Sequence, residues 1–208
     1  IAVSQGILKQ VSEAYRKIRN TFRYLLGNIS DFNYKTDAVQ LADMEELDQW
    51  IMLKLHKLLD KVNKGYEDCE FHVVYHAVHN FCNVDLSAYY VDIVKDRLYC
   101  EEVDSKARRS CQTALYEILV ALTQVMTPIL SFTTEEVWKY LPKEDKELSV
   151  QLSGWPQVNP EAINDALEAK WDNILAVRGE VTKKLEEKRA AKEIGKALDA
   201  QVMLYADG

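Results

Sequence analysis

The chain has 208 residues, of which 48% are hydrophobic, with only 7 glycines and 4 prolines. This profile excludes a disordered chain and favours a packed helical protein, and no apolar run reaches the roughly 18–20 residues that a bilayer-crossing helix needs. The net charge of −7 opposes nucleic-acid binding, which depends on Lys and Arg, unless the basic residues gather on one face.

The first predicted element is a long helix over residues 5–27. Apolar residues recur there every three or four positions, and Gly27-Asn28 supplies a stop. A second arc of this helix is basic and polar, interrupted only by Glu13. Guanidinium groups at successive turns suit the phosphates of a nucleic-acid backbone, but a solvated face with a few ion pairs explains the arc equally well. The arc holds Lys9, Arg16, Asn20 and Arg23, flanked by Lys17 and Arg19.

Four further helices are expected between residues 43 and 126. Asp43 and Glu46 have the spacing of a capping box, which would open the second helix of the chain. Asn83 and Asp85 are candidate caps at the junction of the next two helices. The expected ranges are 43–65, 70–82, 85–99 and 105–126.

The pattern changes after Pro128. Residues 133–136 form a second capping box, for a short helix ending at residues 141–142. Residues 148–152 alternate apolar and polar, like a short strand or an extended segment, and residues 200–205 resemble a strand without a visible partner. The expected parts are a helical bundle (1–142), an extended crossing segment (143–159), and a long charged helix with the first strand of a truncated subdomain (160–208).

Signatures of catalysis are absent from the sequence. It contains no Gly-rich phosphate loop, no Gly-x-Ser-x-Gly elbow and no His-Glu-x-x-His metal helix, so no complete active site is expected. Cys69, His72, His76 and His79 have spacings that allow two imidazoles to share a metal ion. Cys69 falls at the expected helix start, and no second ligand cluster exists in the sequence. A polar helix face is therefore the favoured interpretation, RNA contact comes next, and a metal site is the least favoured.

Several other features have structural interpretations. The four cysteines stand singly, which favours reduced, partly buried thiols and a cytoplasmic location. The Glu- and Lys-rich residues 181–192 favour a self-paired, solvated helix face. The tryptophans sit in apolar contexts typical of packing residues; they are Trp50, Trp138, Trp155 and Trp171.

Ordered segments of the chain resemble a known family. Residues 12–28 look like the helix that opens the anticodon-binding domain of class I aminoacyl-tRNA synthetases for branched aliphatic amino acids, and later segments resemble the bacterial-type isoleucyl-tRNA synthetases in particular. Tyr89-Tyr90 departs from the family, which more often has a Phe there. We expect this difference to affect packing and not function. The later matching segments are 71–81, 85–90, 95–99, 128–138, 149–150, 155–156, 171–178 and 189–195.

The resemblance implies an all-α, class Ia anticodon-binding helical bundle, with a short extended segment and the start of a small α/β appendage. It implies a ligase that attaches isoleucine to tRNA(Ile) using ATP and Mg, and that edits mischarged valine. The ATP-site signatures of class I synthetases are absent here, so this piece is expected to have no catalytic residue and no cofactor. The bacterial family often adds a zinc module with Cys pairs beyond the last residue of this sequence.

The expected partners are tRNA(Ile) and the catalytic, editing and C-terminal domains of the synthetase, in a cytoplasmic monomer without membrane contact. The alternative is a helical protein-interaction module without RNA binding, which scattered basic residues and an exposed apolar patch would favour. The RNA-binding candidates are Lys9, Arg16, Arg19, Asn20, Arg23, His76, Lys95 and Arg97.

Overall fold

The computed structural model describes residues 3–142 and 146–205. These residues form helices joined by loops, with no β-strand among them, so the predicted all-α fold is confirmed. The chain divides into two compact units, residues 1–163 and residues 164–208. Among the described residues, no helix combines the length and the apolar character that crossing a bilayer requires.

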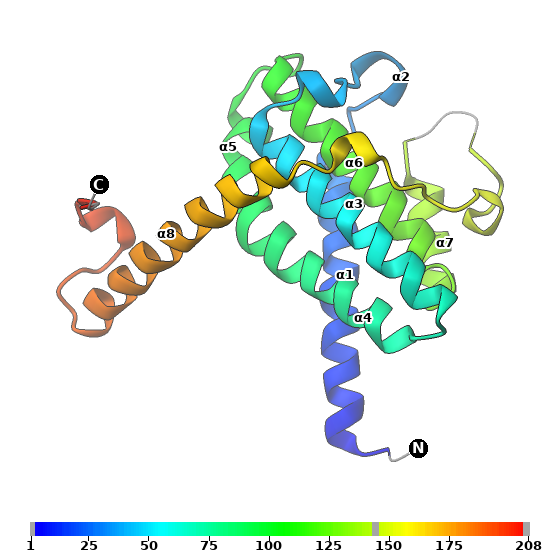
Figure 1. Ribbon diagram of the computed structural model, residues 1–208, viewed down its shortest axis with the longest axis horizontal. Helices are drawn as coiled ribbons and strands as arrows, with labels where there is room; N and C mark the ends of the chain where they lie inside the picture. The colour runs from blue at the N-terminus through cyan, green and yellow to red at the C-terminus, as the bar shows by residue number, and fades with distance from the viewer. Residues whose placement is uncertain (1–2, 143–145, 206–208) are drawn as a thin grey trace. The chain divides into compact units, whose positions relative to one another are not determined.

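Helix α1 (Gln5–Asn28) matches the prediction closely. The Ser4 hydroxyl caps its start by accepting a hydrogen bond from the Ile7 amide at 3.3 Å. Its buried side chains recur with helical spacing, while its first turns project beyond the neighbouring helices (Figure 1). The buried apolar residues of the helix are Ala14, Ile18, Phe22 and Leu25.

Two short turns lead into helix α3 (Glu46–Glu67): α2 (Tyr34–Asp37) and the 3-10 turn η1 (Leu41–Asp43). The capping box predicted for the start of α3 is wrong, because the residue before the helix is Glu45 and no side chain caps its first turn. The backbone of η1 closes on itself, with the Met44 amide donating to the Leu41 carbonyl at 3.3 Å. The carboxylate expected to cap α3 therefore belongs to a preceding turn.

The next helices run on without a break, and the predicted caps at their junction, Asn83 and Asp85, are wrong. The backbone stays in the right-handed helical region at Asn80 and Tyr90, so a π-helical stretch joins two α-helices where a turn was expected. The Val91 amide donates to the Leu86 carbonyl, five residues back, which is the backbone spacing of a π-helix. The three parts are α4 (Phe71–Asn80), η2 (Phe81–Tyr90) and α5 (Val91–Cys100).

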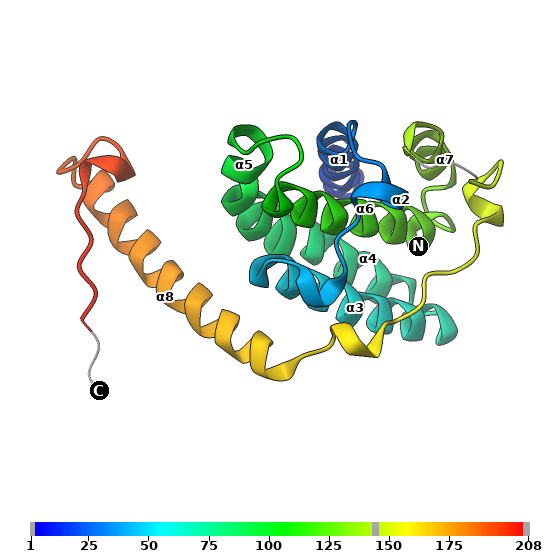
Figure 2. The same ribbon diagram turned by 90° about the horizontal axis from the view of Figure 1, so that it is seen from above.

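Helix α6 (Lys106–Met126) is the centre of the first unit. The Ser105 hydroxyl accepts from the Arg108 amide at 3.2 Å and starts the helix. Most of its side chains are buried, because α1, α3, α5 and α7 (Ser131–Tyr140) surround it. Seen from above, α5, α1 and α7 lie in one layer, and α3 lies on the other side of α6 (Figure 2).

Helix α7 begins two residues before the second predicted capping box, so that prediction is also wrong. Its Glu135 side chain instead accepts from the Ser149 hydroxyl at 2.8 Å and the Val150 amide at 3.2 Å, which ties the following segment to the helix. That segment forms a 3-10 turn, η3 (Val150–Leu152), where a strand or extended piece was expected. A second turn, η4 (Pro160–Ala162), closes the first unit.

The second unit contains helix α8 (Asp165–Ala190), which starts five residues later than predicted, with Asn164 as its cap. Its charges pair along the helix, as expected for a solvated face; one example is Lys184 with Glu187 at 2.8 Å. A turn, η5 (Ala197–Asp199), follows. The strand predicted at 200–205 is not formed, since no neighbouring strand among the described residues offers hydrogen-bonding partners.

Candidate nucleic-acid interface

Helix α1 presents a continuous polar ridge to solvent. Its apolar side packs on α6, and α7 and η2 contact its two flanks (Figure 2). The residues predicted on the polar arc all have exposed side chains, because they lie opposite the buried positions on the helix. The structure thus brings five of the eight RNA-binding candidates onto one outward surface, here called the α1 ridge: Lys9, Arg16, Arg19, Asn20 and Arg23.

The charge of α1 differs from that of the other long helices. It carries five basic residues and one acidic residue, which gives a formal charge of +4 in a chain of net charge −7. By contrast, α3 has four basic and four acidic residues, and α8 has six of each, so both are formally neutral. Helix α6 has three basic residues and one acidic residue, a formal charge of +2, but its Arg108 and Arg109 pair with Asp31. The largest positive charge among the long helices is therefore on α1, which carries the ridge.

Most cations of the ridge are available for a ligand. Arg16 pairs with Glu13 on the preceding turn. Lys9, Arg19 and Arg23 have no ion-pair partner among residues 3–142 and 146–205. Because an exposed ion pair is worth little, the Arg16 guanidinium can exchange Glu13 for a phosphate at small cost.

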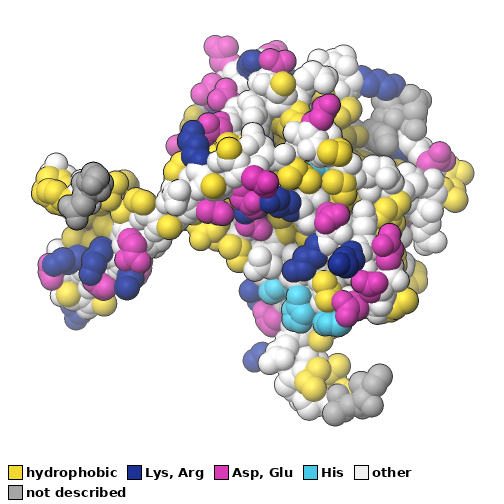
Figure 3. Space-filling model, viewed as in Figure 1, with side chains coloured by type: hydrophobic (Ala, Val, Ile, Leu, Met, Phe, Trp, Pro, Cys, Tyr) yellow, Lys and Arg dark blue, Asp and Glu magenta, His cyan; other side chains and the backbone are white. Residues whose placement is uncertain are grey.

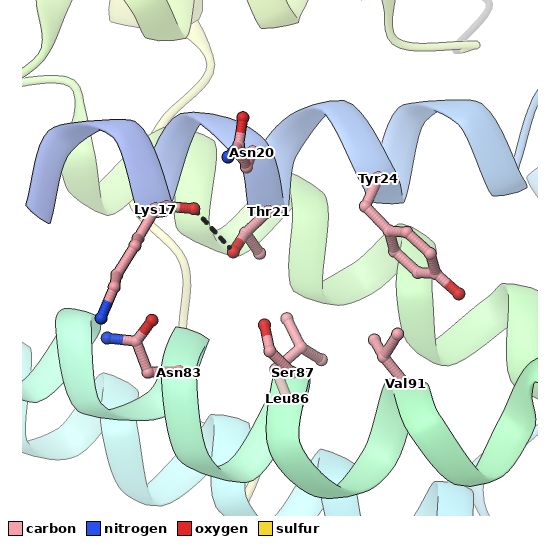
Figure 4. A pocket seen from close by; sticks show the side chains of 8 residues that line it. All are labelled: Lys17, Asn20, Thr21, Tyr24, Asn83, Leu86, Ser87 and Val91. Atoms are coloured by element: carbon pink, nitrogen blue, oxygen red, sulfur yellow. Dashed lines mark hydrogen bonds between the residues drawn. The ribbon is translucent and has the colours of Figure 1, made fainter. Parts of the chain in front are cut away.

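A groove of about 360 Å³ runs along one flank of the ridge, between α1 and η2. Lys17 and Asn83 reach toward each other from its opposite walls, whereas Asn20 points away from the groove (Figure 4). The Asn83 amide also lies 2.8 Å from Nε2 of His79, and burial, then the nearby charge of Lys17, lower the pKa of that histidine. Ammonium, amide and neutral imidazole groups suit sugar and phosphate oxygens.

A second groove, of about 150 Å³, lies on the other flank, between α1 and α7. The Tyr15 and Thr133 hydroxyls are 3.0 Å apart and join the two helices beside it. Its walls combine cations, apolar side chains, one carboxylate and one exposed aromatic ring. The lining residues are Arg19, Phe22, Arg23, Leu26, Thr133, Glu136, Val137 and Tyr140.

The family described as "Anticodon-binding domain of tRNA ligase" matches residues 48–204, about three quarters of the chain. The chain belongs to this family. Isoleucine–tRNA ligases of Moorella thermoacetica and Syntrophomonas wolfei are 54% and 52% identical to it over 208 and 206 residues, and that of Natranaerobius thermophilus is 47% identical over 207. The chain spans 22% of the length of each of these relatives. The resemblance predicted from the sequence is confirmed.

The other RNA-binding candidates of this anticodon-binding domain lie apart from the α1 ridge. His76 is exposed on α4, with its ring 4.9 Å from that of Tyr75. Lys95, on α5, is exposed and pairs with Asp92 at 3.0 Å. Among the described residues, neither side chain has a contact with the ridge cations, so both stay predictions.

Arg97 has a structural partner. Its guanidinium contacts the carboxylate of Asp48 at 3.0 Å, and only 21% of its side chain is exposed. Asp48 is fully buried and also accepts from the hydroxyls of Tyr90 at 2.8 Å and Ser110 at 2.5 Å. Burial raises the pKa of Asp48, and these three donors oppose that shift by stabilising the charged form. Arg97 is therefore left out of the RNA-binding residues proposed below.

The Cys and His residues considered as metal ligands have other surroundings. Cys69 lies just after α3 in the left-handed region, with φ +57°, and its amide donates to the Tyr66 carbonyl at 3.1 Å. Among the described residues, no group of three or more His, Cys, Asp or Glu side chains is arranged to hold a metal ion. All four cysteines are free, and Cys82 and Cys111 are buried, which agrees with the predicted reduced thiols.

Three of the four tryptophans have the predicted packing roles. Trp50 and Trp138 are buried in the core. Trp155 is partly exposed, but its indole Nε1 donates to Asn63 at 2.6 Å and its ring meets Tyr66 edge-on at 5.3 Å. Tyr140 is an exposed aromatic at the end of α7 that lines the α1–α7 groove with Arg19 and Arg23 and that the sequence did not single out.

The face of the first unit that carries α3 has a different character from the ridge. Acidic and basic side chains mix there without a basic patch, and the histidines gather over α4 (Figure 3). Mixed charge of this kind suits a solvated surface. Since α1 lies across α6 from α3, the ridge and the mixed face point in different directions (Figure 2).

Proposed function

We propose that this chain is the part of an isoleucine–tRNA ligase that binds the anticodon stem and loop of tRNA(Ile). The observation that carries the proposal is the α1 ridge: it lies on a helix of formal charge +4 in an otherwise strongly acidic chain, and three of its cations, Lys9, Arg19 and Arg23, have no ion-pair partner among the described residues. Family membership supports it, as do the names of the relatives. The exposed guanidinium groups of the ridge would hold backbone phosphates, while grooves on either side receive parts of splayed nucleotides.

In this proposal the domain contributes recognition and no reaction. Docking of the anticodon arm would orient the tRNA so that its acceptor end reaches a distant active site of the whole ligase. That ligase would attach isoleucine using ATP with Mg, would edit mischarged valine, and would act as a cytoplasmic monomer. The described residues offer no ligand set for a zinc ion, so none is assigned to this part of the chain.

The acidic remainder of the chain favours specific docking over general adhesion to nucleic acid. A net charge of −7 repels phosphates at long range, and the ridge attracts them only when it faces the backbone. Screening at physiological salt limits both effects to about 8 Å. Binding should therefore depend on the orientation that the bundle imposes on the RNA.

A titration of the 208-residue chain with fluorescent tRNA tests the proposal. The ligands are tRNA(Ile), the same tRNA with a changed anticodon, and an unrelated tRNA, each at two salt concentrations. We expect tightest binding to tRNA(Ile), a loss of affinity when the anticodon changes, and weaker binding at high salt. Absence of binding to tRNA(Ile) at low salt would refute the proposal.

One observation favours a second function, the helical protein-interaction module. The projecting turns of α1 expose Ile7, Leu8 and Val11, with 44%, 52% and 58% of each residue accessible. They continue the apolar stripe that is buried further along the helix, so they suit a protein surface, such as another domain of the same ligase. If Val11→Ser abolished binding to a separately prepared catalytic domain while Arg23→Ala left tRNA binding unchanged, this second function would replace the first.

A further inference from the structure

The two flanks of the α1 ridge differ in what they can bind. The groove beside η2 has both polar and apolar walls, its one cation is Lys17, and its one tyrosine, Tyr24, is half-buried. The groove beside α7 has two arginines and Tyr140, a residue that is 72% exposed. Exposed aromatic rings next to basic groups are the arrangement on which proteins stack unpaired bases.

We propose that the α1–α7 groove receives one unpaired base of the RNA, stacked on Tyr140, while Arg19 and Arg23 hold the adjoining phosphates. This inference rests on the proposed function, and it assigns a subsite and a stacking residue to it. Stacking needs no particular base, since every base has a π-face, and the arginines add charge neutralisation. The apolar floor formed by Phe22, Leu26 and Val137 is what a base, rather than a phosphate, would cover.

The size of the groove agrees with a single ring. Its volume of about 150 Å³ is half of the roughly 300 Å³ at which pockets for drug-sized ligands begin. A whole nucleotide would not fit inside it. The sugar and phosphates would therefore stay at the rim, where the long side chains of Arg19 and Arg23 can follow them.

Glu136 lines the same groove and decides which part of the nucleotide can enter. Its carboxylate repels a phosphate, so the backbone is kept outside. The same carboxylate accepts hydrogen bonds from amino or imino groups on a base edge. Glu136 thus orients the base with a donor edge toward α7, and Glu136→Gln, which adds a donor of its own, should change which base is preferred.

Fluorescence of 2-aminopurine measures this stacking directly. The 208-residue chain is titrated with anticodon stem-loop RNA in which 2-aminopurine replaces each loop nucleotide in turn. We expect one loop position to show quenching on binding. Tyr140→Ala should abolish that quenching and weaken binding by about tenfold, within the range known for one stacked base, whereas Tyr140→Phe should keep both.

Phe132→Ala is the matched control, because Phe132 is 95% exposed on the same helix and does not line the groove. It should leave affinity and quenching unchanged. If RNA binds but Tyr140→Ala behaves as wild type, or if Phe132→Ala causes an equal loss, the subsite is refuted and the proposed function stands. If RNA does not bind the unaltered chain, both fail.

Discussion

Removing cations from the α1 ridge should flatten the salt dependence of tRNA binding, residue by residue. The substitutions are Lys9→Ala, Arg19→Ala and Arg23→Ala, alone and combined. These side chains are exposed and have no ion-pair partner among the described residues, so their removal should leave the fold intact. Any change in binding then reports on contacts with the RNA.

The expected change in the salt dependence follows from the number of phosphates that the ridge can neutralise. Each neutralised phosphate contributes about −0.7 to −0.9 to the slope of log K against log salt. If Lys9, Arg16, Arg19 and Arg23 each hold one, the slope is about −2.8 to −3.6, and raising salt from 50 to 200 mM weakens binding by about 50- to 150-fold. Each single substitution should then reduce the slope by about 0.7 to 0.9.

The assay is a fluorescence titration with tRNA(Ile) at four or more salt concentrations. Lys61→Ala is the control, because it removes one exposed positive charge from α3, which lies across α6 from the ridge (Figure 2). It should lower affinity slightly at most and leave the slope unchanged. An unaltered slope in the triple variant, or an equal change with Lys61→Ala, would show that the ridge does not hold the RNA backbone.

Three further outcomes are expected. Glu13→Gln should raise tRNA affinity at low salt by up to about fivefold, because it frees Arg16 from an exposed ion pair; an unchanged affinity would mean that Arg16 contacts no phosphate. Arg97→Ala should lower the free energy of unfolding in urea by about 3 kcal/mol, since it leaves the buried Asp48 carboxylate without its counter-charge; a change under 0.5 kcal/mol would refute that role. Burial raises the pKa of Glu117, so the folded state binds this proton more tightly than the unfolded chain, and the residue's contribution to stability falls as pH rises through its folded pKa. Urea unfolding of Glu117→Gln at pH 5 and pH 8 should show a larger stability gain over wild type at pH 8, and an equal gain at both would contradict this.

Helix type and helix face could be predicted from the sequence because they depend on local spacing. The three- and four-residue recurrence of apolar residues in α1 determines which side packs and which side meets water, whatever helices surround it. The basic arc of the α1 ridge was visible for the same reason. The sequence could not show whether the cations of this arc are available to a ligand. Only the structure shows that Arg19 and Arg23 lack acidic partners among the described residues.

Helix ends and residue roles depended on contacts between distant parts of the chain. Asp43 has the spacing of a cap, but the backbone closes a turn before α3 starts. Glu135 has the same kind of spacing, yet its carboxylate is taken by Ser149, fourteen residues away. Arg97 looked like a surface cation until the fold placed Asp48 against it, 49 residues earlier in the chain.

By itself the sequence determined a mainly helical chain, its family, and the polar ridge of its first helix, because periodicity and ordered motifs are properties of the chain alone; the strands that it suggested near residues 148–152 and 200–205 were wrong. The tertiary structure decided which ridge cations have no ion-pair partner among the described residues and which cations, like Arg97, balance a buried charge. It also decided that α7 lies beside α1, so that Tyr140 and Arg23, 117 residues apart, share one groove. Such a groove exists only after packing, because no local pattern encodes which helices become neighbours.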